Sequence, residues 1–324
     1  MIENDTLISL IKSKPLVDIE AHASVATALE VMKVNKVTAL VVYGLKDHWL
    51  GAGNSNLCIG QKQLIGLITI LDVILHLSSK HLETSATNYT DLISQTRVVD
   101  IIGKNEESMS LWVGDTHSKL KFALEPLSKG VHRFLVPIYP PTSLENPHPK
   151  PIDFQLCSQS DVIAQFAPLI ESDIRFKPLA ATPVSSFCSS SPILAKRSDP
   201  VLPLLTSLAS MNLMAVPVVD HEGILADTLS ASDFKSVLEG DVSIVQDIIK
   251  AITSGMTVGD FLGLVSRGKV RVLKGVVSPG VSFGEAVSKI SQSRIHRLWV
   301  VDAFGVPIGV LSLGDMIRGI LSAL

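Results

Sequence analysis

The residues best suited to chemistry in this chain lie in four short elements, each a serine or threonine followed three positions later by an aspartate. A hydroxyl at a helix N-cap accepts a backbone N–H, and an acid in the first turn complements the helix dipole. A carboxylate at a strand-to-helix junction can also accept both hydroxyls of a ribose, and free N–H groups nearby favour a phosphate. We expect capping in all four elements. Whether at least one of them also contacts a ligand is left open, with both answers given equal weight. The pairs are Thr69 with Asp72, Ser158 with Asp161, Ser230 with Asp233, and Ser312 with Asp315.

A second candidate site consists of adjacent histidine and arginine residues that open two predicted strands, His132-Arg133 and His296-Arg297. Successive strand residues point to opposite faces, so at most one of each pair should face inward unless the strand entrance is twisted. A single copy would indicate a solvated basic pair. Two copies at the same place in alternate units predict that the cations converge on a shared centre. Phosphates could bind there through charge-assisted hydrogen bonds, with a pH dependence from histidine.

The elements that must position these residues recur along the chain. Each hydroxyl–aspartate pair follows a helix-period segment and a β-branched run, which predicts the order helix, strand, strand, helix. The helices are expected over residues 25–35, 119–128, 201–211 and 283–291, and the strands that follow them over 37–43, 134–138, 215–219 and 298–301. The four repeats are expected over residues 10–82, 96–171, 180–240 and 255–324.

The sequence also contains a repeat at longer spacing and several irregular stretches between the predicted elements. Residues 98–103 recur at 258–263, so the chain looks like a duplicated pair. Polar or proline-rich excursions are expected between the strands of the first and second units. The serine-rich stretch 185–192 is interpreted as the entry to the third unit.

Composition limits the function classes. The chain of 324 residues is 46% hydrophobic and 18% charged, with a net charge of −3. This balance argues against a nucleic-acid binder driven by bulk charge. Three separated cysteines predict neither a disulfide framework nor a zinc site. With no secretory signal or membrane span evident in the sequence, we expect a soluble intracellular protein, cytoplasmic and/or nuclear, with neither nucleic acid nor membrane as partner.

The sequence contains no HExxH, GxSxG or GxxxxGK[ST] motif. An enzyme of this length should show some constellation of nucleophile, base or metal ligands. We therefore expect no enzyme activity, no metal and no cofactor.

The unit order, the hydroxyl-x-x-aspartate endings and the two His-Arg strands resemble CBS domains. Four such repeats with His-Arg in the second and fourth resemble, more narrowly, the gamma subunit of the AMP-activated and sucrose-non-fermenting protein kinases. The most specific match is residues 293–302 followed by 307–315, and the excursion around Trp49 resembles the plant gamma-like branch. The resemblance extends from about Lys14 to the C-terminus and is weakest in the third repeat.

The resemblance implies an α/β (α+β) fold in which two repeats pair through their sheets into a module. Two modules would then stack into a disc whose nucleotide clefts face its centre. The four aspartates and their hydroxyl partners would contact ribose, and both His-Arg pairs would contact phosphate. Animal gamma subunits differ at the positions of Thr38, Gln159, Ser160 and Asp161. The clefts that bind nucleotide in those subunits therefore do not predict which clefts are occupied in this chain.

The function implied by the resemblance is that of a non-catalytic regulatory gamma-type subunit of a sucrose-non-fermenting-related Ser/Thr protein kinase complex. Such a subunit would bind AMP, ADP or ATP and associate with a kinase catalytic (alpha) subunit and a beta-type scaffold subunit. Two alternatives remain: a stand-alone CBS sensor of adenosyl ligands, and a nucleotide-independent scaffold.

Overall fold

The computed structural model describes residues 15–45, 57–83, 89–104, 108, 111–141, 149–211, 213–234, 242–266 and 271–324. In this part of the chain one pattern recurs four times: a short first strand or bridge, a helix, two antiparallel strands and a second helix or helical turn. We call these the first to fourth units. The segment around Trp49 and the middle of the proline-rich loop, residues 142–148, lie outside the described residues.

The bounds of these elements are as follows. The first unit consists of β1 (Asp18–Glu20), α1 (Val25–Asn35), β2 (Ala39–Leu45), β4 (Lys62–Thr69) and α2 (Ile70–Glu83). The second consists of α5 (Leu120–Ser128), β5 (Arg133–Ile138), β6 (Asp153–Ser158) and α6 (Gln159–Ser172). The third consists of β8 (Ala195–Lys196), α8 (Val201–Ser210), β9 (Ala215–Val219), β10 (Leu225–Ser230) and the 3-10 turn η6 (Ala231–Asp233). The fourth consists of β11 (Val276–Val277), α12 (Phe283–Ser293), β12 (Arg297–Val301), β13 (Pro307–Ser312) and α13 (Leu313–Ala323).

The predicted helices and hairpin strands are thus confirmed to within about two residues at each end. Local chemistry explains their positions. The helices α1 and α12 begin at Ser24 and Ser282, whose hydroxyls accept N–H groups in the first turn, and end at Lys36 and Arg294 in the left-handed conformation. In the last hairpin Gly305, with a φ of +84°, closes the turn between β12 and β13.

The short first strands were not predicted. Each of β1, β8 and β11 pairs in parallel with the strand that follows the helix, and Val113 forms the equivalent bridge to Leu135 in the second unit. With two or three residues each, they are too short to show an alternating pattern.

The serine-rich stretch 185–192 was wrongly interpreted as the entry to the third unit. Within it β7 (Ser189–Ser190) pairs with Gly309 and Val310, and so forms the edge strand of the fourth unit's sheet. A Cβ at Gly309 would lie 3.0 Å from the Ser189 carbonyl oxygen, so a larger residue there would hinder this pairing. The stretch was assigned by its position ahead of the third unit, and no local pattern could show a pairing with residues more than 100 positions away.

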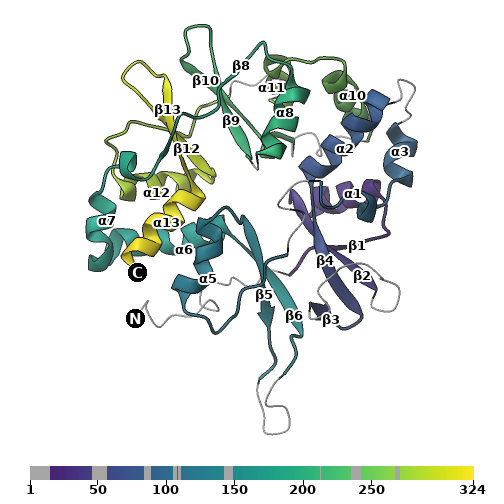
Figure 1. Cartoon of the computed structure of the whole chain (residues 1–324), viewed down its shortest axis with the longest axis horizontal. Helices are drawn as coiled ribbons and strands as arrows, with labels where there is room; N and C mark the ends of the chain where they lie inside the picture. The colour runs from purple at the N-terminus through teal and green to yellow at the C-terminus, as the bar shows by residue number, and fades with distance from the viewer. Residues whose placement is uncertain are drawn as a thin grey trace.

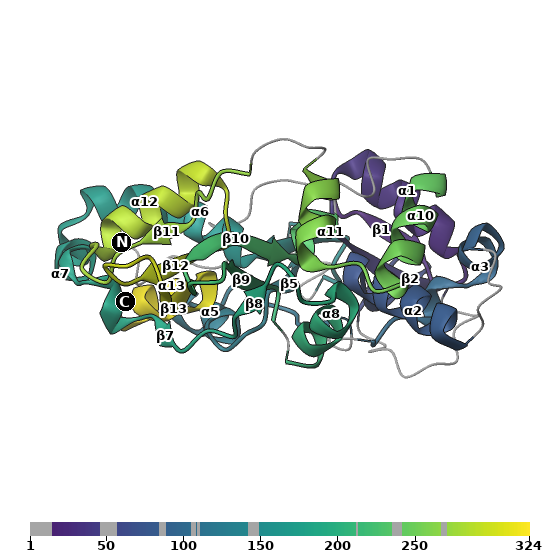
Figure 2. The ribbon, with the colours of Figure 1, turned by 90° about the horizontal axis from the view of Figure 1, so that it is seen from above.

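The four units form a ring in the order first, second, fourth, third, and the ring is flattened when seen from the side (Figures 1 and 2). The sheets of the first and second units share an apolar cluster that includes Val41, Leu67 and Leu135. The third and fourth units meet similarly through Ala215 and Trp299. These contacts form the two sheet-paired modules that the resemblance implied.

The two modules join through their helices, where the largest apolar cores lie. One core is shared by the first and third units, with α2 packed against α8 and α10 (Val242–Thr253). The other is shared by the second and fourth units, with α13 packed against α5 and α6. Each large core is therefore built from units that are not consecutive in the sequence, which ties the two modules into one disc.

Segments between the units brace this arrangement. The N–H of Val98 donates to the carbonyl of Ala23 in the first unit at 2.9 Å. The N–H of Val258, in the repeated segment, donates equivalently to Asp199 in the third unit at 2.8 Å. This equivalence supports the duplication seen in the sequence.

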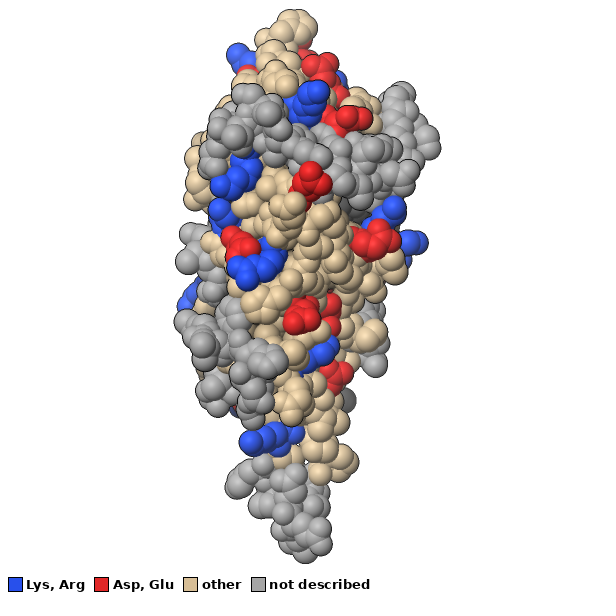
Figure 3. Space-filling model, turned by 90° about the vertical axis from the view of Figure 1, so that its right-hand side faces the viewer, with Lys and Arg blue, Asp and Glu red and all other residues tan. Residues whose placement is uncertain are grey.

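The surface seen from the side of α2, α3 (Tyr89–Gln95) and α10 carries scattered charges separated by uncharged atoms (Figure 3). No basic patch dominates the described part of this face. Among the helices that the structure describes, none combines the length and apolar character needed to cross a membrane.

Candidate functional site

A cavity of about 670 Å³ lies where the four units meet, and residues from all of them line it. The hydroxyl residue that ends each unit's hairpin lines this cavity: Thr69, Ser158, Ser230 and Ser312. Both predicted His-Arg pairs line it as well. Nine of the twelve predicted site residues therefore meet in one place, and the exceptions are Asp72, Asp161 and Asp233.

Basic side chains dominate the charged lining of the cavity. The described lining contains the basic residues Lys129, His132, Arg133, His296, Arg297 and Arg318. Asp315 is the only acidic residue among the lining residues that the structure describes. Such a cavity suits an anion with several acceptor oxygens.

The strand register explains why only two units supply cations. Arg133 lies opposite Ser158, and Arg297 lies opposite Ser312. The residues opposite Thr69 and Ser230 at the same register positions are alanines, Ala39 and Ala215. Because the second and fourth units are neighbours in the ring (Figure 1), the cavity has a basic half and a neutral half.

Both members of each His-Arg pair line the cavity, although strand alternation predicted at most one. The strands β5 and β12 begin at Arg133 and Arg297, so each histidine immediately precedes its strand. Alternation therefore does not apply to the histidines, because they lie outside the strands. The predicted convergence of the two pairs is confirmed, because His296 lies within electrostatic range of Arg133 and His132.

Enclosure and like charges both act on this cluster. The pKa of His296 is lowered, first by partial desolvation and then by the positive charges of Arg297, Arg133 and His132, although the residue remains exposed. Burial lowers the pKa of Arg297 to about 10, and the carboxylate of Asp233 offsets part of that effect. Arg297 thus keeps its positive charge at neutral pH in surroundings that disfavour it.

The four aspartates act as helix caps, as expected. Oδ2 of each accepts the N–H of its hydroxyl partner, at 2.9 Å in Asp72, Asp161 and Asp315 and at 2.7 Å in Asp233. The pair Thr257 and Asp260 makes a similar hydroxyl-to-carboxylate contact at a helix that follows no hairpin. The hydroxyl-x-x-aspartate pattern by itself therefore marks a cap and does not distinguish a ligand site.

Asp315 differs from the other three in lining the cavity. Its Oδ1 accepts one hydrogen bond, at 3.1 Å, from Arg318 on the next turn of the same helix. The Arg318 side chain is 63% exposed. Asp315 is thus the aspartate best placed to meet a ligand, with a partner that can move away at small cost.

Asp72 is completely buried and bonded on both oxygens. Oδ2 accepts the N–H and the hydroxyl of Thr69, and Oδ1 accepts the Ser108 hydroxyl at 3.0 Å. We therefore assign it a structural role.

Asp72→Ala is expected to lower the free energy of unfolding by about 2–4 kcal/mol, because three buried donors lose their acceptor. Urea denaturation of the purified chain measures this loss. The matched change Asp260→Ala removes an exposed cap and should cost about 1 kcal/mol. Equal losses in the two variants would contradict the assignment.

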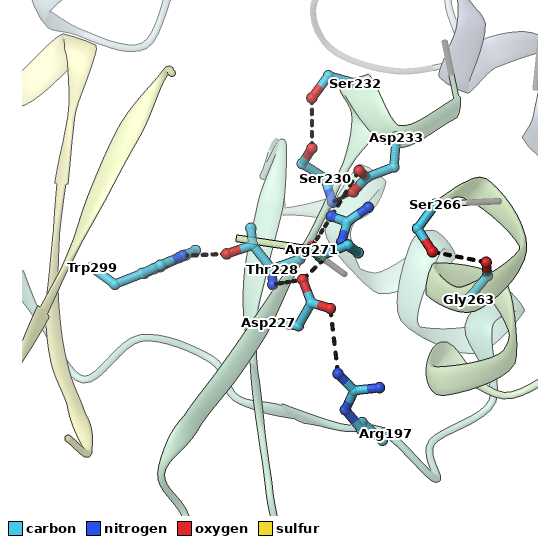
Figure 4. A network of polar contacts seen from close by, with 10 residues as sticks. All are labelled: Arg197, Asp227, Thr228, Ser230, Ser232, Asp233, Gly263, Ser266, Arg271 and Trp299. Carbon is cyan, nitrogen blue, oxygen red and sulfur yellow. Dashed lines mark hydrogen bonds and ion pairs between the residues drawn. The ribbon is translucent and has the colours of Figure 1, made fainter. Parts of the chain in front are cut away.

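Asp233 belongs to a polar network that sequence reasoning missed (Figure 4). Arg271 donates to Asp227, to Asp233 and to the carbonyl of Thr228, each at 2.9 Å. The Trp299 indole donates to the Thr228 hydroxyl at 2.8 Å and so joins the fourth unit to the third. No local pattern could have revealed the network, since Arg271 lies 44 residues from Asp227.

No group of three histidine, cysteine, aspartate or glutamate side chains in the described residues is arranged to hold a metal ion. The polar groups of the cavity are mostly hydroxyls and cations, which suit an anionic organic ligand better than a metal.

Comparison with known proteins agrees with this architecture. The CBS domain family matches residues 249–322. The chain is 28% identical to the Arabidopsis thaliana protein named SNF1-related protein kinase regulatory subunit gamma-like PV42b, over 97% of this chain and 94% of that protein. Identity to the protein named gamma-like PV42a of the same plant is 25% over the same shares.

A more distant similarity reaches the 5'-AMP-activated protein kinase subunit gamma of Saccharomyces cerevisiae, with 27% identity over 38% of this chain and 35% of that protein. The crystal structure of protein MJ1225 from Methanocaldococcus jannaschii shares the fold, with a TM-score of 0.70, 18% identity and coverage of 97% and 99% of the two chains. The chain thus contains a CBS domain and is similar over nearly its whole length to SNF1-related kinase regulatory gamma-like subunits, which confirms the resemblance seen in the sequence.

Proposed function

We propose that the chain is a non-catalytic regulatory subunit of gamma type that binds an adenine nucleotide in its central cavity. It would associate with a kinase catalytic subunit and a beta-type scaffold subunit. The observation that carries the proposal is the convergence of two His-Arg pairs, from units far apart in the sequence, on one cavity. We take the four units as CBS repeats with the boundaries expected from the sequence, except that the third begins after β7, which pairs with the fourth unit's sheet.

The two halves of the cavity suit different parts of a nucleotide. Arg133, Arg297 and the two histidines would hold the phosphates, because guanidinium groups make paired charge-assisted bonds to phosphate oxygens. Asp315 would accept ribose hydroxyls. The opposite wall carries hydroxyl and apolar side chains, including Thr38, Met214 and Pro217, and can accommodate an uncharged ring.

Regulation would follow from differential affinity. The positive charges of Arg297, Arg133 and His132 disfavour protonation of His296, and a bound phosphate would offset that repulsion. A nucleotide would therefore favour the disc conformation in which the second and fourth units hold their cations close together. Such a population shift is the means by which the subunit would influence a kinase.

Calorimetric titration with AMP and then ATP tests the nucleotide site. We expect saturable binding to the wild-type chain and about ten-fold weaker binding to His296→Ala, since the imidazole is one of four basic contacts. His221→Ala is the matched control, because that histidine is exposed and lies next to Glu222, outside the cavity. No binding of either nucleotide to the folded wild-type chain would overturn the site.

Co-purification with tagged catalytic and beta-type subunits tests the partners. A stable ternary complex is expected because the two Arabidopsis relatives that match nearly the whole chain are named kinase regulatory subunits. Nucleotide binding without complex formation would instead indicate a stand-alone sensor. Complex formation without any nucleotide binding would indicate a scaffold.

A further inference from the structure

Arg271 reaches the cap aspartate of the third unit from a segment remote in sequence. It follows α11 (Val258–Val265) in the chain, and its guanidinium lies between Asp227 on β10 and Asp233 on η6 (Figure 4). Its third bond goes to the Thr228 carbonyl. The side chain is 27% exposed, against 6% for Asp227 and 13% for Asp233. One cation thus bridges two carboxylates in a largely enclosed position.

These contacts use both oxygens of Asp233. Oδ2 accepts the Ser230 N–H at 2.7 Å, and Oδ1 accepts Arg271 at 2.9 Å. Ser230, Ala231 and Ser232 line the central cavity, but Asp233 does not. The carboxylate that would meet a ribose in this unit is therefore already satisfied within the chain.

The third and fourth units differ in how firmly their aspartates are held. Arg318 makes one bond to Asp315 and one to the Ser128 carbonyl, at 3.1 and 3.2 Å, from an exposed position. Arg271 makes three bonds and is the closer of the two arginines that bond the nearly buried Asp227. Removing it would leave buried charge uncompensated, which costs more than a neutral hydroxyl returns.

We propose that Arg271 is an in-chain occupant of the third unit's cleft, which closes Asp233 to ribose-bearing ligands and directs the nucleotide to Asp315. The inference deepens the proposed function and rests on it for the identity of the ligand. It makes Arg271 the residue that keeps Asp233 from serving as a second ribose acceptor beside Asp315.

The test counts AMP molecules bound per chain by equilibrium dialysis, with folding checked by thermal melting. The wild-type chain should bind one AMP through Asp315, and Arg271→Ala should bind a second. Adding Asp233→Asn to Arg271→Ala should remove the second site. Arg197→Ala is the matched control, because that arginine bonds Asp227 at 3.4 Å without contacting Asp233, and it should leave one site.

Two further variants keep the test decisive if Arg271→Ala does not fold. Arg271→Gln retains a donor for one carboxylate and should also open the second site. In the otherwise unchanged chain, Asp315→Asn should weaken AMP binding about ten-fold, whereas Asp233→Asn should change it less than two-fold. A larger loss from Asp233→Asn than from Asp315→Asn would overturn the closure.

The outcomes separate this proposal from the proposed function. If both the wild type and Arg271→Ala bind one AMP per chain, nucleotide binding stands and the proposal that Arg271 closes Asp233 to ligand is overturned. No binding to the wild type overturns the function as proposed, and binding gained by Arg271→Ala alone would then still support the closure. No binding to any folded variant overturns both.

Discussion

Replacing Arg297 by methionine is expected to weaken AMP binding by about 10- to 100-fold and, at the same time, to stabilise the ligand-free chain. Loss of a charge-assisted hydrogen bond costs about 1.5–3 kcal/mol, which corresponds to that range of affinities. The gain in stability follows from the low pKa of the guanidinium, about 10, which shows that the fold penalises its positive charge. Methionine fills a similar volume without that penalty.

The gain should be on the order of 1 kcal/mol, since substitution of enclosed charges by apolar side chains often stabilises a fold by one to a few kcal/mol. Titration calorimetry gives the affinity, and urea denaturation without nucleotide gives the stability. Arg197→Met, at an arginine outside the cavity, should change the affinity little. A destabilised Arg297→Met chain with unchanged AMP affinity would show that Arg297 serves the fold and not the ligand.

Opposite effects on binding and stability would show that Arg297 lowers the stability of the ligand-free chain and raises its affinity for the nucleotide. A structural arginine behaves differently, because its loss lowers stability. Arg271 is the internal comparison: its charge is compensated by Asp227 and Asp233, which raise its pKa against the effect of burial. Two arginines in one chain thus differ in how far the protein compensates their charge: Arg271 bonds two carboxylates, whereas Asp233 offsets only part of the effect of burial on Arg297.

Sequence reasoning found the features that are encoded locally. The caps at Asp161 and Asp315 and the helix and strand order depend on residues within a few positions of one another, so spacing and residue type suffice. The convergence of His132 and His296 was inferred because the pairs occur twice at the same place in a repeated unit.

Features made by distant segments were not found in this way. The contact of β7 with Gly309 and the bridge from Arg271 to Asp227 join residues that no short pattern relates. The distinction among the four aspartates was also missed, because it depends on which donors reach each carboxylate from elsewhere in the fold. For Asp72 that donor is Ser108, and for Asp233 it is Arg271.

AMP affinity is expected to rise by several-fold as the pH falls from 8 to 6.5, through protonation of His296. In the ligand-free chain the pKa of His296 lies below its usual value of 6.5, because partial desolvation disfavours its charged form and neighbouring cations repel its proton, although the residue stays exposed. A bound phosphate dianion reverses the local charge and raises that pKa, so binding takes up a proton. Affinity then increases as the pH falls, by at most ten-fold per pH unit for one proton.

Stability without nucleotide should respond in the opposite direction. A histidine whose folded pKa is lowered contributes most above its unfolded value of 6.5, and this contribution is lost as the pH falls below that value. The ligand-free chain should therefore be less stable at pH 5.5 than at pH 7.5, and His296→Ala should reduce that difference. Urea denaturation at the two pH values measures it.

The pH range for binding must stay above the second pKa of the phosphate, about 6, because a protonated phosphate would itself bind less tightly. Between pH 6.5 and 8, titrations in buffers of different ionisation enthalpy count the protons taken up. The wild-type chain should take up a fraction of a proton per AMP, and His296→Ala should take up less, with His221→Ala unchanged. Equal uptake in the wild type and His296→Ala would assign the proton to another group and remove the imidazole from the phosphate site. A reduced uptake together with reduced affinity would place His296 in contact with phosphate, since a merely structural histidine would not change the proton count.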